Sequence, residues 1–333
     1  MAGGIHHVTA ITGNVQLNVD FYVGFLGLRL VKRTGGFEDA EQLHLFYGDR
    51  LGSPGSVVTF LVWPDGARGR VGLGQVSEIA FAVPPASIGT WLQRAIEGRV
   101  PATGPATELG QTVLRLRDPD GIIIKLVGAD MPAAALLPAR HAPTRIHSVT
   151  MLTEDAKATA DFIKPFGFRM GRQDGPIMRM ESGADFIDLR QSAGFVGGSP
   201  GTGTIDHLAL RAPDAGAIRQ MQASLQGSGD MTLHDRKYFR SLYLREPMGA
   251  LLELATDGPG FTVDEGAEEL GQRLFHPGFR QRPGRGSPRD AAAILDAGRG
   301  EDPDARPALH PSLPHTRRPG WQRHRAAPRH WRQ

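Results

Sequence analysis

The chain of 333 residues contains no cysteine. This absence excludes disulfide bonds, thiolate metal ligands and a cysteine nucleophile. Proteins without disulfides are typical of reducing compartments, so we expect a cytoplasmic protein.

Long apolar runs are also lacking. No uninterrupted hydrophobic stretch approaches the roughly 20 residues that a membrane helix needs. The first ten residues, MAGGIHHVTA, have neither the basic region nor the apolar region of a secretory signal peptide. We therefore expect neither a membrane partner nor a signal peptide.

The net positive charge of the chain comes from its C-terminal part. Residues 281–333 contain eleven arginines and no lysine against five acids, a net charge of +6, so residues 1–280 carry about −3 of the total of +3. We expect the basic, Pro- and Arg-rich tail 278–333 to be disordered. A nucleic-acid partner would require a folded basic face with a recognisable motif, and the sequence has none.

What the sequence does contain is an internal repeat. Ile5–Thr12 (IHHVTAIT) and Ile146–Thr153 (IHSVTMLT) match at five of eight positions, and LRDPDGIIIKLVGAD (116–130) matches LREPMGALLELATD (244–257). Each repeat begins with an alternating strand, continues with a helical period and ends in further strands joined by Pro-Gly turns. We expect an α+β fold of four βαβββ modules, at 1–64, 76–130, 146–192 and 204–264, that form two cup-shaped sheets.

Three potential metal ligands lie on strands of the first and last modules. His7 is in the first strand, His207 is in TIDHLALR (204–211), and Glu253 interrupts an apolar run near residue 257. Two imidazoles and one carboxylate form the facial triad that suits Fe(II) and leaves positions open for substrate and dioxygen. We therefore expect Fe(II) as the cofactor.

The repeat indicates which modules share the metal. The positions that correspond to the three candidate ligands in modules two and three are Ser148, Glu78 and Lys125. A lysine at a ligand position argues against a metal there. We expect modules one and four to share the cup that binds the metal, and modules two and three to share a degenerate one.

The sequence resembles a known family over residues 4–275. The motifs that carry the resemblance are HHVTAIT, HLFYGDRLGSPGSVVTFLVWP (44–64), DRKYFRSLYLREP (235–247) and LLELATDGPGF (251–261). They are similar to those of the ring-cleaving dioxygenases that act on hydroquinones and related dihydroxy aromatics, within the vicinal oxygen chelate, or glyoxalase, superfamily. The resemblance implies the βαβββ fold, an Fe(II) cofactor, and a small aromatic diol and O₂ as substrates.

The resemblance also implies roles for particular residues. The metal ligands carry over to His7, His207 and Glu253. The catalytic or substrate-contacting residues map to His6, Thr9, Arg236 and Tyr243. The residue before the second ligand is commonly His in this family and is Asp206 here, which puts any proton-transfer role of that position in doubt.

The chemistry suggests how these four residues act. Arg236 would hold an oxyanion, and Tyr243 would hydrogen-bond a substrate hydroxyl. His6 would act as an acid or base, or would orient the ligand His7 as its hydrogen-bond partner. The alternative for His6 is that it points away from His7, because neighbours alternate along a strand. His44 we interpret as structural.

Two other functions remain open at this point. The first is a glyoxalase-like metal-dependent isomerase or lyase, and the second is a non-catalytic small-molecule binding module of the same fold. The isomerase would need a second carboxylate near Phe60–Leu61, where module one has none. The oligomeric state is also open, with a homo-oligomer among the alternatives.

Overall fold

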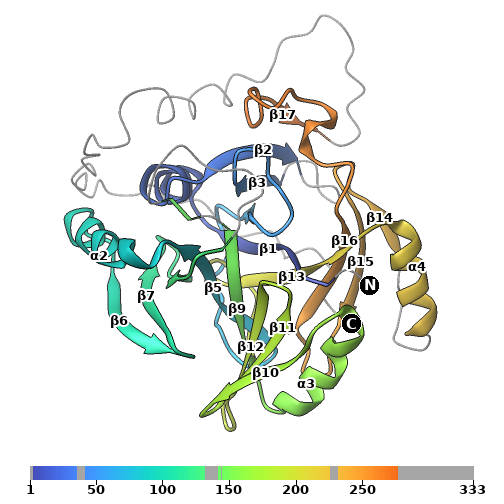
Figure 1. Ribbon diagram of the computed structural model, residues 1–333. Helices are drawn as coiled ribbons and strands as arrows, with labels where there is room; N and C mark the ends of the chain where they lie inside the picture. The colour runs from blue at the N-terminus through green and yellow to red at the C-terminus, as the bar shows by residue number, and fades with distance from the viewer. Residues whose placement is uncertain (1–2, 36–41, 132–141, 144, 226–231, 277–333) are drawn as a thin grey trace, which may run out of the picture.

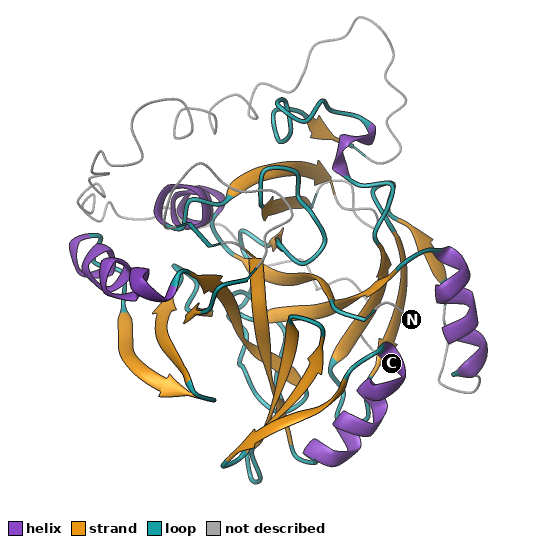
Figure 2. Ribbon diagram, in the orientation of Figure 1, coloured by secondary structure: helices purple, strands orange, loops and turns teal. Residues whose placement is uncertain are grey.

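The computed structural model describes residues 3–35, 42–131, 142–143, 145–225 and 232–276. Two mixed, curled β-sheets lie at the centre, and the helices lie at the periphery (Figures 1 and 2). The tail predicted from residue 278 falls outside the described residues.

The first sheet combines modules one and four. Its strands are, in spatial order, β14 (Leu233–Asp235), β15 (Arg240–Arg245), β16 (Leu251–Thr256), β13 (Ile205–Ala212), β1 (Ile5–Thr12), β4 (Val57–Val62), β3 (Leu43–Gly48), β2 (Arg29–Gly35) and β17 (Leu274–Phe275). Modules two and three form the second sheet in the same way. Its strands are β10 (Arg169–Asp174), β11 (Ile177–Ser182), β12 (Asp185–Gln191), β9 (Arg145–Thr153), β5 (Gln75–Val83), β8 (Ile123–Gly128), β7 (Gln111–Arg117) and β6 (Ala102–Glu108).

The strand pairing follows one rule in all four modules. The first strand of each module runs parallel to its last strand, as β1 does to β4 and β13 to β16. The first strands of two modules then meet antiparallel at the centre of each sheet, β1 with β13 and β5 with β9. The α+β fold of βαβββ modules is confirmed, and so is the prediction that modules one and four share a sheet.

A helix follows the first strand of each module. The helices are α1 (Val15–Val19) with the π-helical turn η1 (Asp20–Phe25), η2 (Pro85–Ser87) with α2 (Ile88–Glu97), α3 (Ala156–Ile163) with η3 (Lys164–Phe166), and α4 (Ala215–Ser224). Short polar side chains fix where three of them begin. Asn14, Asp155 and Asp214 each accept the backbone N–H of the residue three positions on, which satisfies a donor that has no partner within the helix.

The buried apolar side chains divide between the faces of the first sheet. Ile5, Val8 and Ala10 of β1 belong to the main core. Positions that alternate with these face the other way, where a second cluster gathers. Its members are Val31, Phe46, Val57, Ala209, Tyr238, Phe239, Ala255, Phe261 and Leu270. This second cluster lines the face that carries the predicted ligands.

The segment from Gly258 to Phe275, which we call the strap, is attached to β2 and supplies the edge strand β17. It contains the short helix η4 (Phe261–Val263) and ends in β17, which runs parallel to β2. Lys32, which is 1% exposed, donates to Asp264 at 2.7 Å and also to Glu265. The strap therefore covers one end of the first sheet.

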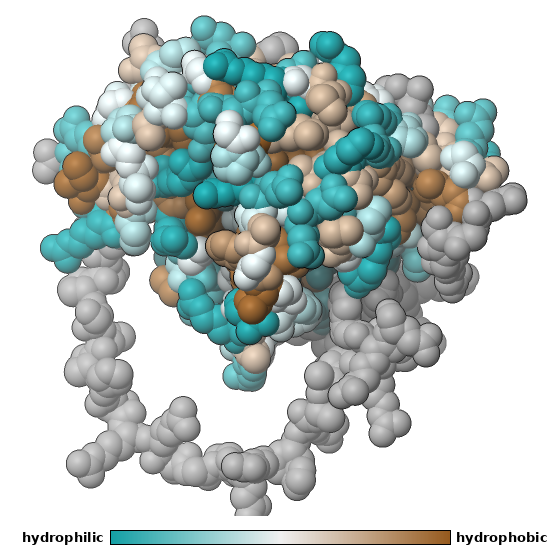
Figure 3. All heavy atoms as spheres, turned by 90° about the horizontal axis from the view of Figure 1, so that it is seen from below, coloured by the Kyte–Doolittle hydropathy of each residue, from teal (hydrophilic) through white to brown (hydrophobic). Residues whose placement is uncertain are grey.

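The surface is mixed in polarity. Seen from below, hydrophobic side chains form small groups between hydrophilic ones (Figure 3). None of the described helices is both long and apolar enough to span a bilayer.

Candidate active site

The structure brings the three predicted ligands together. His7 on β1, His207 on β13 and Glu253 on β16 are 2%, 7% and 0% exposed. The Oε2 atom of Glu253 lies 3.2 Å from Nε2 of His7 and 2.9 Å from Nε2 of His207. Their potential ligand atoms all lie within 4.8 Å of one another, and among the described residues this is the one such group able to hold a metal.

Strand register explains why the three side chains face the same way. Ala209 on β13 lies opposite His7 on one side and Glu253 on the other. His207 is two residues before Ala209 and therefore projects from the same face. Three adjacent strands thus present one ligand each to a single point.

A β-bulge determines the direction of His6. Ile5 pairs with Leu210 and His7 with Ala209, so His6 is an extra residue in β1. A bulge re-aims side chains that would otherwise alternate. Nδ1 of His6 lies 2.8 Å from Nδ1 of His7, so the two side chains are neighbours.

Hydrogen bonds fix the proton positions on His6 and His7. Nε2 of His6 lies 3.1 Å from the carbonyl oxygen of Thr256, which only accepts, so Nε2 carries the proton. Burial lowers the pKa of His6 to about 3, which leaves the ring neutral and its Nδ1 an acceptor. His7 must then donate from Nδ1, and its Nε2 presents a lone pair to Glu253.

The same arrangement holds for the second histidine. Oδ2 of Asp206 accepts the Nδ1–H of His207 at 2.7 Å. Nε2 of His207 lies 2.9 Å from Oε2 of Glu253, which also faces Nε2 of His7. Ser241 donates to the other carboxylate oxygen, Oε1. Two imidazole nitrogens that converge on one carboxylate oxygen can be held together by a proton or by a metal cation, and this donor set fits Fe(II).

The charges in the site lead to the same interpretation. Burial alone would raise the pKa of Glu253, but the adjacent imidazoles lower it well below its usual value. Burial alone would lower the pKa of His207, but the carboxylates of Asp206 and Glu253 raise it to about 9. A proton on His207 supplies the positive charge when no metal is bound, and a divalent cation would displace it.

Tyr243 and Arg236 lie on one side of the triad. Tyr243 pairs with Glu253 across β15 and β16, and its ring lies 5.5 Å from that of His207 at a steep angle. The guanidinium carbon of Arg236 lies 5.5 Å from the centre of the Tyr243 ring. Burial, assisted by the charge of Glu253, raises the pKa of the Tyr243 phenol. Tyr243 therefore remains a hydrogen-bond donor at neutral pH.

Thr9 lies on the other side, in a chain of polar groups. Its hydroxyl is 2.8 Å from that of Thr59, which is 2.8 Å from Nε2 of His44. Burial, followed by the charges of His7 and His207, lowers the pKa of His44 well below its usual value. The interpretation of His44 as structural missed its place beside the triad. Period-two alternation from Thr59 and its partner Phe46 indicates that His44 shares their face.

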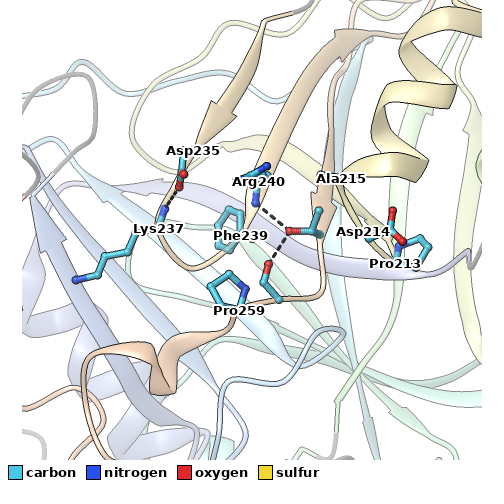
Figure 4. Close-up of a pocket in the computed structure, with 10 residues that line it drawn as sticks. Pro213, Asp214, Ala215, Asp235, Lys237, Phe239, Arg240 and Pro259 are labelled. Carbon is cyan, nitrogen blue, oxygen red and sulfur yellow. Dashed lines mark hydrogen bonds between the residues drawn. The ribbon is translucent and has the colours of Figure 1, made fainter.

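A cavity of about 400 Å³ is lined by Phe239 and Thr256, among other residues (Figure 4). The Phe239 ring lies 5.2 Å from the rings of both His6 and His7. The cavity and the two histidines therefore share Phe239 as a neighbour.

The corresponding place in the second sheet is filled by an ion network. Nζ of Lys125 lies 2.7 Å from Glu108 and 3.2 Å from Glu78. Arg115 pairs with both carboxylates. The ammonium group of Lys125 thus supplies the positive charge that a metal would supply in the first sheet.

Comparison with known proteins agrees with this geometry. The profile of the Glyoxalase/Bleomycin resistance protein/Dioxygenase superfamily matches residues 4–126. The Bacillus subtilis protein named "Putative ring-cleaving dioxygenase MhqO" is 35% identical over 286 residues, which cover 82% of this chain and 91% of that protein. The chain belongs to the ring-cleaving dioxygenase family of this superfamily.

Two further members of the ring-cleaving dioxygenase family extend the comparison. The chlorohydroquinone/hydroquinone 1,2-dioxygenase of Sphingobium indicum is 30% identical, over 81% of this chain and 90% of that protein. A crystal structure of a Bacillus subtilis protein titled "putative dioxygenase" superposes with a TM-score of 0.76 at 34% identity, over 82% of this chain and 91% of the other. The similarity therefore spans both halves of the chain and all three strands of the triad.

Proposed function

We propose that this protein is an Fe(II)-dependent dioxygenase that opens the ring of a hydroquinone- or catechol-type dihydroxy aromatic with O₂. The observation that carries the proposal is the buried convergence of Nε2 of His7 and Nε2 of His207 on Oε2 of Glu253, at 3.2 and 2.9 Å. The names of the relatives supply the reaction class.

His7, His207 and Glu253 would hold the iron. Iron held there would supply Lewis acidity toward a phenol and would bring the electron-rich ring and O₂ together. Ser241 orients the carboxylate through Oε1, so that Oε2 is left for the metal. His6 uses both ring nitrogens in hydrogen bonds, and its role is to orient His7 rather than to move a proton.

Tyr243 and Arg236 bind and polarise the substrate. The phenol of Tyr243 remains protonated and donates a hydrogen bond to a substrate oxygen. The guanidinium of Arg236, which lies over the Tyr243 ring, stabilises negative charge that develops on oxygen. A fixed cation in a buried site stabilises such charge better than solvent does, because it needs no reorientation.

His44 is placed to accept a hydrogen bond from a substrate hydroxyl. Its ring is neutral because its pKa is well below the usual value. Nε2 is engaged by Thr59, while Nδ1 has no hydrogen-bond partner among the described residues. Thr9 completes the chain of hydroxyls and keeps the imidazole orientation fixed. With such a low pKa the imidazole orients the hydroxyl but does not take its proton.

The two alternatives find less support. A glyoxalase-like isomerase would need a fourth ligand on β4, and the residues of β4 on the ligand face are Val57, Thr59 and Leu61. A binding module needs no cation site, yet this chain keeps three ligands together with their supporting hydrogen bonds.

Oxygen consumption tests the proposal. The protein is reconstituted anaerobically with Fe(II), and oxygen-electrode and ultraviolet traces are recorded with hydroquinone, chlorohydroquinone, methylhydroquinone and catechol. We expect uptake of one O₂ per substrate and a ring-opened absorbing product. The Glu253→Ala variant is the matched control and should consume none. Binding of iron without O₂ uptake with any of the four diols would contradict the proposal.

A further inference from the structure

A second β-bulge lies immediately before the second predicted ligand. Thr9 pairs with His207 and Ala10 with Ile205, so Asp206 is an extra residue in β13. In a regular strand Asp206 and His207 would face opposite sides. The bulge allows the carboxylate of Asp206 to reach the ring of the next residue.

The contact is short and shielded from water. Oδ2 of Asp206 lies 2.7 Å from Nδ1 of His207, and the two side chains are 7% and 8% exposed. The carboxylate accepts the Nδ1–H, which leaves Nε2 as the ring nitrogen that faces Oε2 of Glu253. The bond therefore sets both the tautomer and the orientation of the ring.

We propose that Asp206 is the positioning residue of His207, and that its negative charge, rather than its shape alone, strengthens metal binding by this histidine. The inference rests on the proposed function, because it assumes that His207 is a metal ligand. A carboxylate that accepts from a ligand imidazole makes the other ring nitrogen more basic. His7 receives the same orientation from the neutral ring of His6.

The second sheet provides a natural control. The β5–β9 pairing skips Ser77 between Val76 and Glu78, at the position that corresponds to Asp206. The hydroxyl of Ser77 donates to the carbonyl oxygen of Thr150 at 3.1 Å. Ser77 therefore occupies an equivalent bulge in the sheet whose ligand positions are filled by an ion network.

Titration with Co(II) tests the inference without turnover. The visible absorption of Co(II) and competition with a chelator give affinities for the wild type, Asp206→Ala, Asp206→Asn and Ser77→Ala. We expect Co(II) binding to weaken roughly 10–100-fold in Asp206→Ala, the range typical of losing such a supporting partner. Asp206→Asn keeps an oxygen acceptor but loses the charge, so its affinity for Co(II) should lie between those of the wild type and Asp206→Ala. Ser77→Ala should bind as the wild type does.

Each result separates this inference from the function on which it rests. Unchanged affinity and an unchanged Co(II) spectrum in both Asp206 variants would overturn the positioning role and leave the metal site intact. Wild-type affinity in Asp206→Asn alone would overturn the role of charge. Absence of Co(II) binding by the wild type would overturn the metal site itself. If Asp206→Ala does not fold, as judged by circular dichroism, Asp206→Asn decides.

Discussion

His7, His207 and Glu253 meet at a buried point where Nε2 of each histidine faces Oε2 of Glu253. When no metal is bound, a proton on His207 holds the imidazole and the carboxylate together. A divalent cation would displace this proton and bind all three ligand atoms at once. Metal binding therefore competes with protonation of His207.

Replacing any one ligand should remove the metal and keep the fold. We expect His7→Ala, His207→Ala and Glu253→Ala each to weaken Fe(II) binding by more than about 100-fold, beyond the effect of losing a supporting partner. Iron content after anaerobic gel filtration measures this, with Tyr243→Phe as a control that keeps all ligands. Full iron retention and activity in one variant would remove that residue from the triad.

His44 should affect catalysis but not metal binding. We expect His44→Ala to lower kcat by roughly 10-fold, the rate equivalent of one hydrogen bond. His44→Gln keeps a hydrogen-bonding group beside Thr59 and should retain more of the wild-type rate than His44→Ala. Steady-state rates and iron content are measured together. A kcat close to that of the wild type in both variants would return His44 to a structural role.

Sequence and structure agree best for the ligands themselves. His7, His207 and Glu253 could be predicted because their chemistry and the repeat restrict where a metal can bind. The direction of His6 could not, because a bulge is a property of strand register and not of one residue. His44 was missed because its closeness to the triad depends on how the sheet curls.

At the scale of elements, the strap and β2 form a unit. Arg29 donates to the carbonyl oxygen of Ala267, and Arg33 to that of Gly271. Contacts to backbone oxygens leave no pattern in the sequence. The strap beyond residue 264 was therefore absent from the predicted modules, whereas the βαβββ order, which depends on hydrophobic periodicity and turns, could be predicted.

The buried ion pairs of Lys32 should hold the strap in place. Removing one partner of a buried pair typically costs about 3–5 kcal/mol, because it leaves a buried charge without compensation. We expect Lys32→Ala to lower the free energy of unfolding by about this amount, measured by urea denaturation. Arg50→Ala breaks an exposed pair between Arg50 and Glu268 of the strap and should cost less than about 1 kcal/mol. Equal losses in the two variants would contradict this account.

At the scale of the whole molecule, two similar sheets have taken different roles. The first presents a metal triad, and the second presents Lys125 between Glu78 and Glu108. Burial would raise the pKa of Glu108, but the charge of Lys125 lowers it to about 2. The positions that hold the candidate metal ligands in the first sheet thus hold a stabilising ion network in the second.

This network should make stability depend on pH. Because the pKa of Glu108 is lower in the folded state, its contribution is present above about pH 4.5 and is lost as the pH falls toward 2. We expect Glu108→Gln to lower the free energy of unfolding at pH 7 by about 1–3 kcal/mol. Urea denaturation from pH 7 to pH 3 should show the difference shrinking. Two results would refute this account of the network. One is a loss of unfolding free energy in Glu108→Gln that is constant with pH, and the other is a loss equal to that in the exposed control Glu97→Gln.

The central claim is that the triad shared by the first and last modules supports ring cleavage by dioxygen. Isotopically labelled O₂ tests it most directly. Iron-loaded protein is mixed with hydroquinone under labelled gas, and the product is analysed by mass spectrometry under conditions that limit exchange with water. The account predicts a ring-opened product that carries both labelled atoms. An intact ring, or a quinone without label, would contradict it.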